Sequence, residues 1–210
     1  MFRSFLIMAA TFHNPIVDDI KLVRVACIGD SITYGHGTVD DDHTYPAQLQ
    51  GWLGSGYEVG NFGVPNASAS WYGAISGTIP YQSTQAYIDS TDWVSVSPSI
   101  VVIMLGANDS VVWNAAAYKA DYADTVDHYL GLVSKPKVYM ILPTAVNINN
   151  IIPTEQIPIL TKIANDRGIP LLNAYEITEP RPDLFVDGVH MNAVGYGWLA
   201  RLVYGGIEYN

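Results

Sequence analysis

Ile100-Val101-Val102-Ile103-Met104-Leu105 is the stretch that decides the fold, because its apolar side chains follow one another without a break and Gly106 ends the run. A strand that is apolar on both faces is typical of a parallel sheet covered by helices on both sides. Further short apolar runs predict the other strands, at residues 23–28, 57–62, 138–142 and 170–173. The sequence therefore predicts a five-stranded parallel sheet.

Segments with helical spacing separate these runs. The longest covers residues 115–133, where aromatic and apolar side chains recur every three or four positions: Tyr118, Tyr122, Val126, Tyr129 and Val133. Residues 154–167 end before Gly168, and glycine commonly ends helices. Other helices are expected at residues 45–53, 82–88 and 193–209. This alternation predicts a doubly wound α/β fold with helices on both faces.

The composition fits one folded domain. Of the 210 residues, 49% are hydrophobic and 14% are charged, which allows a sizeable core and argues against disorder. We place the domain at residues 21–210 and interpret residues 1–20 as an N-terminal arm or an extra strand, with a cleaved secretory signal as the alternative. No apolar run reaches the roughly 18 residues that a membrane span needs.

The charge of the chain restricts its partners. The formal net charge is -10, so nucleic acid is an improbable partner and anionic membrane surfaces would repel the protein. The single cysteine, Cys27, lies in an apolar run and is expected to be buried. The lack of a disulfide favours a cytoplasmic location over secretion without requiring it. Either a monomer or a homodimer is compatible with the sequence.

Polar residues collect where the predicted strands end. The clusters are Gly29-Asp30-Ser31, Gly63-Val64-Pro65-Asn66, Gly106-Ala107-Asn108-Asp109 and, before the last helix, Asp187-Gly188-Val189-His190. In open parallel sheets, sites form at the carboxyl ends of the strands. These clusters are therefore expected to meet at one edge of the sheet.

Ser31, His190 and Asp187 have the chemistry of a nucleophilic triad. A serine hydroxyl needs a neighbouring base, and an imidazole can both take and return a proton near neutral pH. Asp187 precedes His190 by three residues, so in a turn its carboxylate can fold back on the ring. Acyl transfer also needs donors for an oxyanion, and the candidates are the backbone N–H groups of Ser31 and Gly63 and the side-chain amide of Asn108.

The clusters resemble the sequence blocks of the SGNH/GDSL hydrolase family. Residues 29–35 (Gly-Asp-Ser-Ile-Thr-Tyr-Gly) are similar to block I, residues 61–63 (Asn-Phe-Gly) to block II, Gly106-x-Asn108-Asp109 to block III and Asp187-x-x-His190 to block V. The resemblance implies a flavodoxin-like, three-layer α/β/α fold and hydrolysis of esters without a cofactor or metal. It implies Ser31 as nucleophile, Asp187 and His190 as its partners, and Ser31, Gly63 and Asn108 around the oxyanion.

One segment departs from the family pattern. Many members carry a second glycine shortly after the block II glycine, whereas this chain has Pro65 and Asn66. Asparagine tolerates a left-handed backbone better than most residues, so we expect the turn to be kept.

The likeness extends more loosely to carbohydrate O-acetylesterases, including the sialate type. It rests on residues 44–49, 61–64 and 185–190. The sequence thus predicts a serine esterase that removes small acyl groups, acetyl above all, from a carbohydrate. Candidate substrate-binding residues are Asp30, Trp71, Tyr72 and Trp113, although the aromatic side chains are equally compatible with packing between loops.

Other functions are compatible with parts of the sequence. Within the family, a lysophospholipase or thioesterase is an alternative, and a catalytically silent carbohydrate-binding domain is the non-enzymatic one. An α/β-hydrolase is disfavoured because Thr33 stands where its motif needs glycine. A metal-dependent phosphoesterase would use Asp30, Asp109 and His190, or the run Asp40-Asp41-Asp42-His43, but such sites need several converging histidines and carboxylates.

Overall fold

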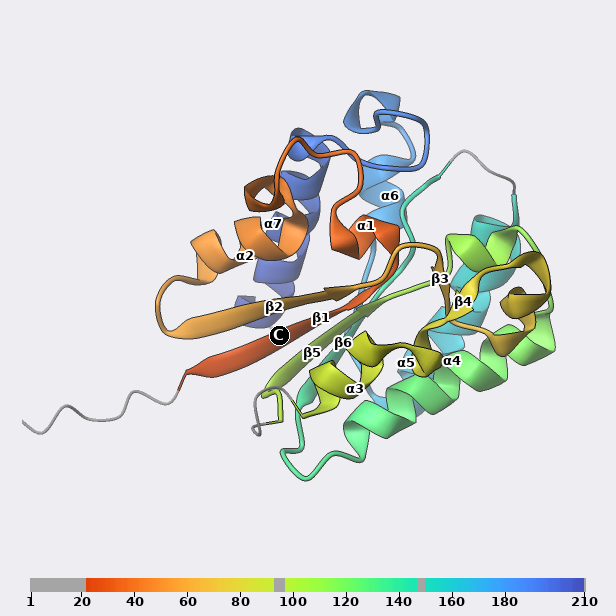
Figure 1. Cartoon of the computed structure of the whole chain (residues 1–210), viewed down its shortest axis with the longest axis horizontal. Helices are drawn as coiled ribbons and strands as arrows, with labels where there is room; N and C mark the ends of the chain where they lie inside the picture. Colours follow the sequence, from red (N-terminus) through yellow and green to blue (C-terminus); the bar gives the residue numbers. More distant parts are fainter. Residues whose placement is uncertain (1–21, 93–96, 147–149, 210) are drawn as a thin grey trace, which may run out of the picture.

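A parallel sheet forms the centre of the molecule, whose computed structural model describes residues 22–92, 97–146 and 150–209. Its five strands lie in the order β2-β1-β5-β6-β7 (Figure 1), and every pairing is parallel. The bounds are β1 Val23–Gly29, β2 Tyr57–Gly63, β5 Ile100–Met104, β6 Lys137–Ile141 and β7 Leu171–Leu172. The predicted five-stranded parallel sheet is confirmed. The arm or extra strand expected at residues 1–20 lies outside the described residues.

Helices cover both faces of the sheet. The short α1 (Ser31–Tyr34) and α6 (Ala174–Thr178) accompany α2 (Tyr45–Leu53) and α7 (Ala193–Tyr209), while α3 (Gln85–Thr91), α4 (Ala115–Leu130) and α5 (Ile157–Arg167) lie on the opposite side (Figure 1). The three-layer α/β/α architecture is therefore confirmed. No helix among the residues with described coordinates is both long and apolar enough to cross a bilayer.

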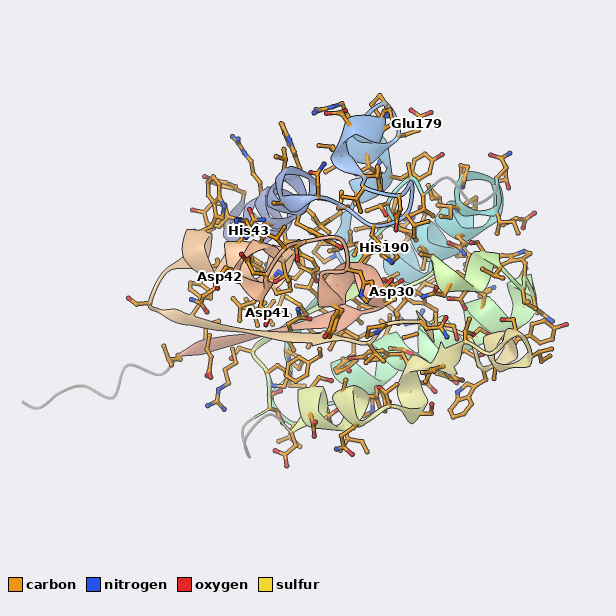
Figure 2. All side chains as sticks on the ribbon, turned by 45° about the horizontal axis from the view of Figure 1, so that its top comes forward. Asp30, Asp41, Asp42, His43, Glu179 and His190 are labelled. Atoms are coloured by element: carbon orange, nitrogen blue, oxygen red, sulfur yellow. The ribbon has the colours of Figure 1, made fainter. Side chains whose placement is uncertain are left out.

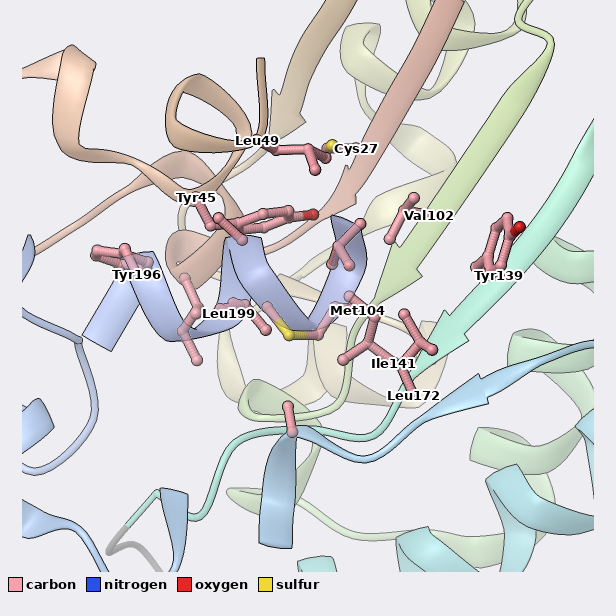
Figure 3. Packing of buried hydrophobic residues seen from close by; sticks show 14 of the residues in the cluster. Cys27, Tyr45, Leu49, Val102, Met104, Tyr139, Ile141, Leu172, Tyr196 and Leu199 are labelled. Carbon is pink, nitrogen blue, oxygen red and sulfur yellow. The ribbon is translucent and has the colours of Figure 1, made fainter. Parts of the chain in front are cut away.

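β5 is buried along its whole length because it packs against helices on both sides. Val102 and Met104 face the cluster that includes Tyr45 and Leu199 of α2 and α7 (Figure 3). Val101 and Ile103 face the second cluster, with Tyr118, Tyr122 and Leu160 of α4 and α5. Successive side chains of a strand point to opposite faces, so an unbroken apolar run supplies both cores at once.

Cys27 on β1 belongs to the core beneath α2 and α7. Its side chain is fully buried, as expected, and burial raises the pKa of the Cys27 thiol to about 12. The thiol is therefore a packing group that stays protonated.

Several helix ends differ from the prediction for identifiable reasons. The helix expected at residues 82–88 is a 3-10 turn, Tyr81–Ser83, followed by α3, because Thr84 caps the N–H of Tyr87 at 3.2 Å and starts a new helix. In the segment expected to begin at residue 154, a π-helical turn covers Ile152–Gln156 and α5 begins only at Ile157. Pro158 cannot donate to the preceding turn, which explains the irregular start.

The helix expected at residues 115–133 ends at Leu130. Gly131 donates its N–H to the carbonyl oxygens of Asp127 and His128, and Val133 beyond it is 96% exposed. The last predicted strand, residues 170–173, is reduced to Leu171–Leu172.

Loops above the sheet contain short elements that the sequence did not suggest. A two-stranded sheet joins β3 (Ala67–Ser68) to β4 (Ile79–Pro80). Further 3-10 turns are Asp41–His43, Trp71–Ser76, Asn108–Ser110 and Pro182–Leu184. These elements surround the carboxyl ends of the strands, where the polar clusters were expected.

Candidate active site

Ser31 stands at the carboxyl end of β1, at the start of α1. Asp30 caps this helix by accepting the N–H of Ile32 at 2.9 Å, and Gly35 ends it with a φ of 106°. Ser31 is 9% exposed, with its Oγ 3.0 Å from Nε2 of His190. The structure thus brings together two side chains that are 159 residues apart in the chain.

The loop that carries His190 is a tight turn stabilised by hydrogen bonds within its own backbone. Val186 donates its N–H to the carbonyl of His190 at 2.9 Å, and Phe185 and Met191 form an antiparallel bridge. Gly188 has a φ of 84°, a left-handed conformation that favours glycine. Figure 2 labels His190 and Asp30 close to each other, and the charges of the two groups interact.

Both carboxylate oxygens of Asp187 form hydrogen bonds with His190. Oδ2 lies 2.7 Å from Nδ1 of His190, while Oδ1 accepts the backbone N–H groups of Val189 and His190 at 2.9 and 2.7 Å. Burial alone would raise the pKa of this carboxyl, but the hydrogen bonds from His190 and Val189 outweigh it and lower the pKa to about 2. Asp187 is therefore ionised at neutral pH and fixes the ring with Nε2 toward Ser31.

Asn108 lies on a 3-10 turn after β5. Its Nδ2 donates to the carbonyl of Ala67 at 2.8 Å, which uses one of the two amide hydrogens. The next residue, Asp109, accepts the N–H groups of Ala69 and Ser70 at 2.8 and 2.9 Å. These bonds tie the block III turn to the loop that follows β2.

Gly63 ends β2 beside α1. A Cβ at this position would lie 2.1 Å from the backbone nitrogen of Tyr34, so the close approach of two backbones requires glycine. Its N–H donates to Oδ1 of Asn61 at 3.0 Å. The role of the Gly63 N–H in an oxyanion hole stays a prediction. In that role the N–H would first have to break its hydrogen bond to the Asn61 side chain.

The departure at Pro65-Asn66 keeps the turn, as expected from asparagine. Asn66 has a φ of 65°, and its side chain donates to the carbonyl of Gly77 at 2.9 Å. Asparagine thus occupies a left-handed position that glycine would adopt freely.

Two carboxyls are buried beneath the site. Asp30 and Asp109 are each 2% exposed. Burial, and to a lesser extent the charge of Asp109, raises the pKa of Asp30 to about 7. The hydrogen bond from Ile32 and the nearby His190 lower this pKa, but by less. Burial likewise raises the pKa of Asp109 to about 6, although the N–H groups of Ala69 and Ser70 oppose it. Substrate contact by Asp30, which caps α1, stays a prediction.

Asp30→Asn is expected to reduce the pH dependence of stability. Because the pKa of Asp30 is higher in the folded state, the folded protein binds a proton more tightly between about pH 4 and 7, and unfolding becomes easier as pH rises through that window. Asparagine keeps the acceptor for Ile32 and cannot ionise.

Denaturant titrations of both proteins at pH 4.5 and pH 8 measure this effect. The wild-type free energy of unfolding should fall more than that of the variant, by on the order of 2 kcal/mol. Equal falls would show that Asp30 does not bear the raised pKa.

The predicted aromatic side chains have partners of their own. Trp71 donates its Nε1–H to Gln82 at 2.9 Å, and its backbone N–H donates to Asp121 at 2.8 Å. The ring of Trp113 packs against Tyr118, with centroids 5.0 Å apart. Tyr72 is 38% exposed on the same turn as Trp71. Substrate binding by Trp71, Tyr72 and Trp113 stays a prediction.

Tyr34 and His36 are residues at the site that sequence reasoning missed. The His36 ring centroid lies 5.1 Å from that of His190 and 5.8 Å from that of Tyr34. The available indication was the pair Gly35 and Gly37, which flank His36 directly after block I.

The run Asp40 to His43 forms an exposed turn in which His43 pairs with Asp40. Within residues 22–92, 97–146 and 150–209, no group of three or more histidine, cysteine or acidic side chains is arranged to hold a metal ion.

A serine, an imidazole and a carboxylate are joined in order at the carboxyl edge of a doubly wound sheet, an arrangement typical of serine hydrolases. Residues 27–198 match the model of the GDSL-like lipase/acylhydrolase family. The chain therefore belongs to the GDSL-like lipase/acylhydrolase family.

A curated relative supports the same assignment. An acetylxylan esterase of Xylanibacter ruminicola is 30% identical over 94% of this chain and 48% of its own length. The chain thus spans about half the length of the curated relative that it matches.

Solved structures share the fold at lower identity. A two-domain esterase active on acetylated mannans, co-crystallized with mannopentaose, gives a TM-score of 0.67 at 17% identity, covering 89% of this chain and 50% of that one. The native aryl esterase of M. smegmatis gives 0.66 at 19% identity, covering 88% and 97%.

Proposed function

We propose that this protein is a serine esterase that removes small acyl groups, acetyl above all, from a carbohydrate. The observation that carries the proposal is the hydrogen-bonded row from Ser31 Oγ to His190 Nε2, at 3.0 Å, and from His190 Nδ1 to Asp187 Oδ2, at 2.7 Å. A serine so placed has a base within reach of its proton, and the base has a fixed orientation.

In the first half of the proposed reaction, His190 accepts the Ser31 proton while Oγ bonds to the ester carbonyl carbon. The carbonyl oxygen becomes an oxyanion. His190 then returns the proton to the alcohol oxygen as the bond to that oxygen breaks, which leaves an acetyl group on Ser31. In the second half, His190 takes a proton from water, the resulting hydroxide oxygen bonds to the acyl carbon, and acetic acid leaves as the bond to Ser31 Oγ breaks and His190 returns the proton to Oγ.

The oxyanion needs donors aimed at the place where its charge develops. The backbone N–H of Ser31, at the start of α1, and the second amide hydrogen of Asn108 are suited to this role. The backbone N–H of Gly63 is the third candidate, and it becomes available once its hydrogen bond to the Asn61 side chain is broken. Asp187, ionised through its hydrogen bonds, stabilises the imidazolium that forms in both halves.

The choice of an acetylated carbohydrate rests on the relative described as an acetylxylan esterase, which is 30% identical over 94% of this chain. It agrees with the looser sequence likeness to carbohydrate O-acetylesterases. The family alternatives, lysophospholipase and thioesterase, have no observation in the structure that favours them.

The experiment that tests the proposal is a panel of esters with one alcohol and different acyl chains, together with acetylated xylo-oligosaccharides. We expect kcat/KM to be at least about tenfold higher for 4-nitrophenyl acetate than for the octanoate, because each added methylene must fit an acyl site made for a small group.

Two results would contradict the proposal. A preference for octanoyl, lysophospholipid or thioester substrates would exclude an acetylesterase. Absence of turnover with every ester, together with no covalent labelling of Ser31 by an organophosphate, would indicate a silent binding domain.

A further inference from the structure

Three rings form a row at the mouth of the site: Tyr34, His36 and His190. Adjacent centroids lie 5.8 and 5.1 Å apart. Tyr34 is 50% exposed and His36 is exposed as well. No hydrogen bond joins the His36 ring to any residue in the described part of the chain, so its nitrogens are not committed to another side chain there.

The backbone that carries His36 is held firmly in place. Gly35 and Gly37 have φ values of 106° and 95°, and the Tyr196 hydroxyl donates to the His36 carbonyl at 2.6 Å. A Cβ on Gly37 would lie 2.6 Å from the Met191 carbonyl oxygen and 3.2 Å from the His190 Cβ. The segment is therefore packed directly against the histidine loop, which fixes the backbone from which both rings project.

The reaction places the alcohol beside this row. To receive a proton, the leaving oxygen must come within about 3 Å of His190 Nε2. The His36 ring neighbours that imidazole, so a sugar joined to the leaving oxygen is large enough to reach it.

A hollow of about 340 Å³ adjoins the row and is lined by the segment from Tyr34 to Asp41. The lining includes two acidic residues, Asp40 and Asp41 (Figure 2 labels Asp41). The hydrogen bond from His43 lowers the pKa of Asp40, so that carboxylate is charged at neutral pH. Carboxylates accept hydrogen bonds from sugar hydroxyls and repel anionic groups.

We propose that Tyr34 and His36 form the subsite for the sugar that carries the ester, and that the sugar is neutral. The Tyr34 ring stacks on the sugar face, and an imidazole nitrogen of His36 exchanges a hydrogen bond with a hydroxyl group. This inference rests on the proposed esterase function and adds to it the class of alcohol. Sialic and uronic acid esters, which carry a carboxylate, are disfavoured.

The test compares Tyr34→Ala, His36→Ala and the double variant on acetylated xylotriose and on ethyl acetate. We expect kcat/KM for the oligosaccharide to fall about tenfold in each single variant and about 30- to 100-fold in the double variant, chiefly through KM. On ethyl acetate, the double variant should lose kcat/KM by a factor at least about tenfold smaller than on the oligosaccharide, because ethanol is too small to span the row of rings.

Two further variants test whether the loss of oligosaccharide activity comes from the Tyr34 ring itself. Tyr34→Phe keeps the ring and should retain most of the oligosaccharide activity. Trp52→Ala removes another half-exposed aromatic side chain, on α2, and should leave both activities unchanged. Thermal unfolding of each variant shows whether it is folded.

The outcomes separate this inference from the proposed function. Equal losses on both substrates, or no loss on the oligosaccharide, would overturn the subsite while the esterase activity stands. Faster turnover of an acetylated uronic acid than of the matching neutral sugar would overturn the preference for a neutral alcohol. Full ethyl acetate activity in a Ser31→Ala variant would instead overturn the proposed mechanism.

Discussion

Ser31→Ala is expected to lower kcat/KM for 4-nitrophenyl acetate by at least about 10³-fold, because the variant has no nucleophile for His190 to activate. The hydroxyl lies 3.0 Å from the imidazole, and acylation begins with that proton transfer. The measurement is steady-state hydrolysis with an active-site titration of the wild type. The residual rate should come only from water attack within the site.

The variant is expected to fold normally. The cap of α1 is the Asp30 side chain, which accepts the Ile32 N–H and is not touched by the change. Ser83→Ala, which removes a hydroxyl bonded to the Pro80 carbonyl on the turn before α3, is the matched control and should keep the wild-type rate. A Ser31→Ala enzyme with undiminished turnover would remove Ser31 from the mechanism.

Asn108→Ala should lower kcat by about 10²- to 10³-fold, the usual effect of losing one oxyanion donor. One hydrogen of the Asn108 amide is committed to the Ala67 carbonyl, which aims the other along a fixed direction. KM for the acetate should change far less than kcat, because the donor is needed most where negative charge develops.

Loss of the Ala67 bond is the structural effect to be separated from catalysis. Asn114→Ala provides the comparison, since Asn114 caps α4 by accepting the Ala117 N–H at 3.0 Å. That variant should lose about 1 kcal/mol of stability and keep its kcat. If Asn108→Ala loses stability to the same extent but retains kcat, the amide only supports the turn and is no oxyanion donor.

The elements that the sequence predicted well are those with strong local patterns. Residues 45–53 and 193–209 form helices with the expected bounds, because their apolar faces meet the sheet. The misplaced ends have local causes: Thr84 acts as a cap, and Pro158 delays the start of α5. The β3–β4 pair lacks such a pattern, since each strand has only two residues.

By itself, the sequence determined the parallel sheet, the place of Ser31 and Asn108 after its strands, and the place of His190 before the last helix. It could do so because side-chain periodicity and turn residues act over a few positions. Only the tertiary structure decided that His36 lies beside His190 and that Asp30 is buried with a raised pKa. These features depend on the packing of segments distant in the chain, and the desolvation and close contacts that produce them exist only once the segments have packed.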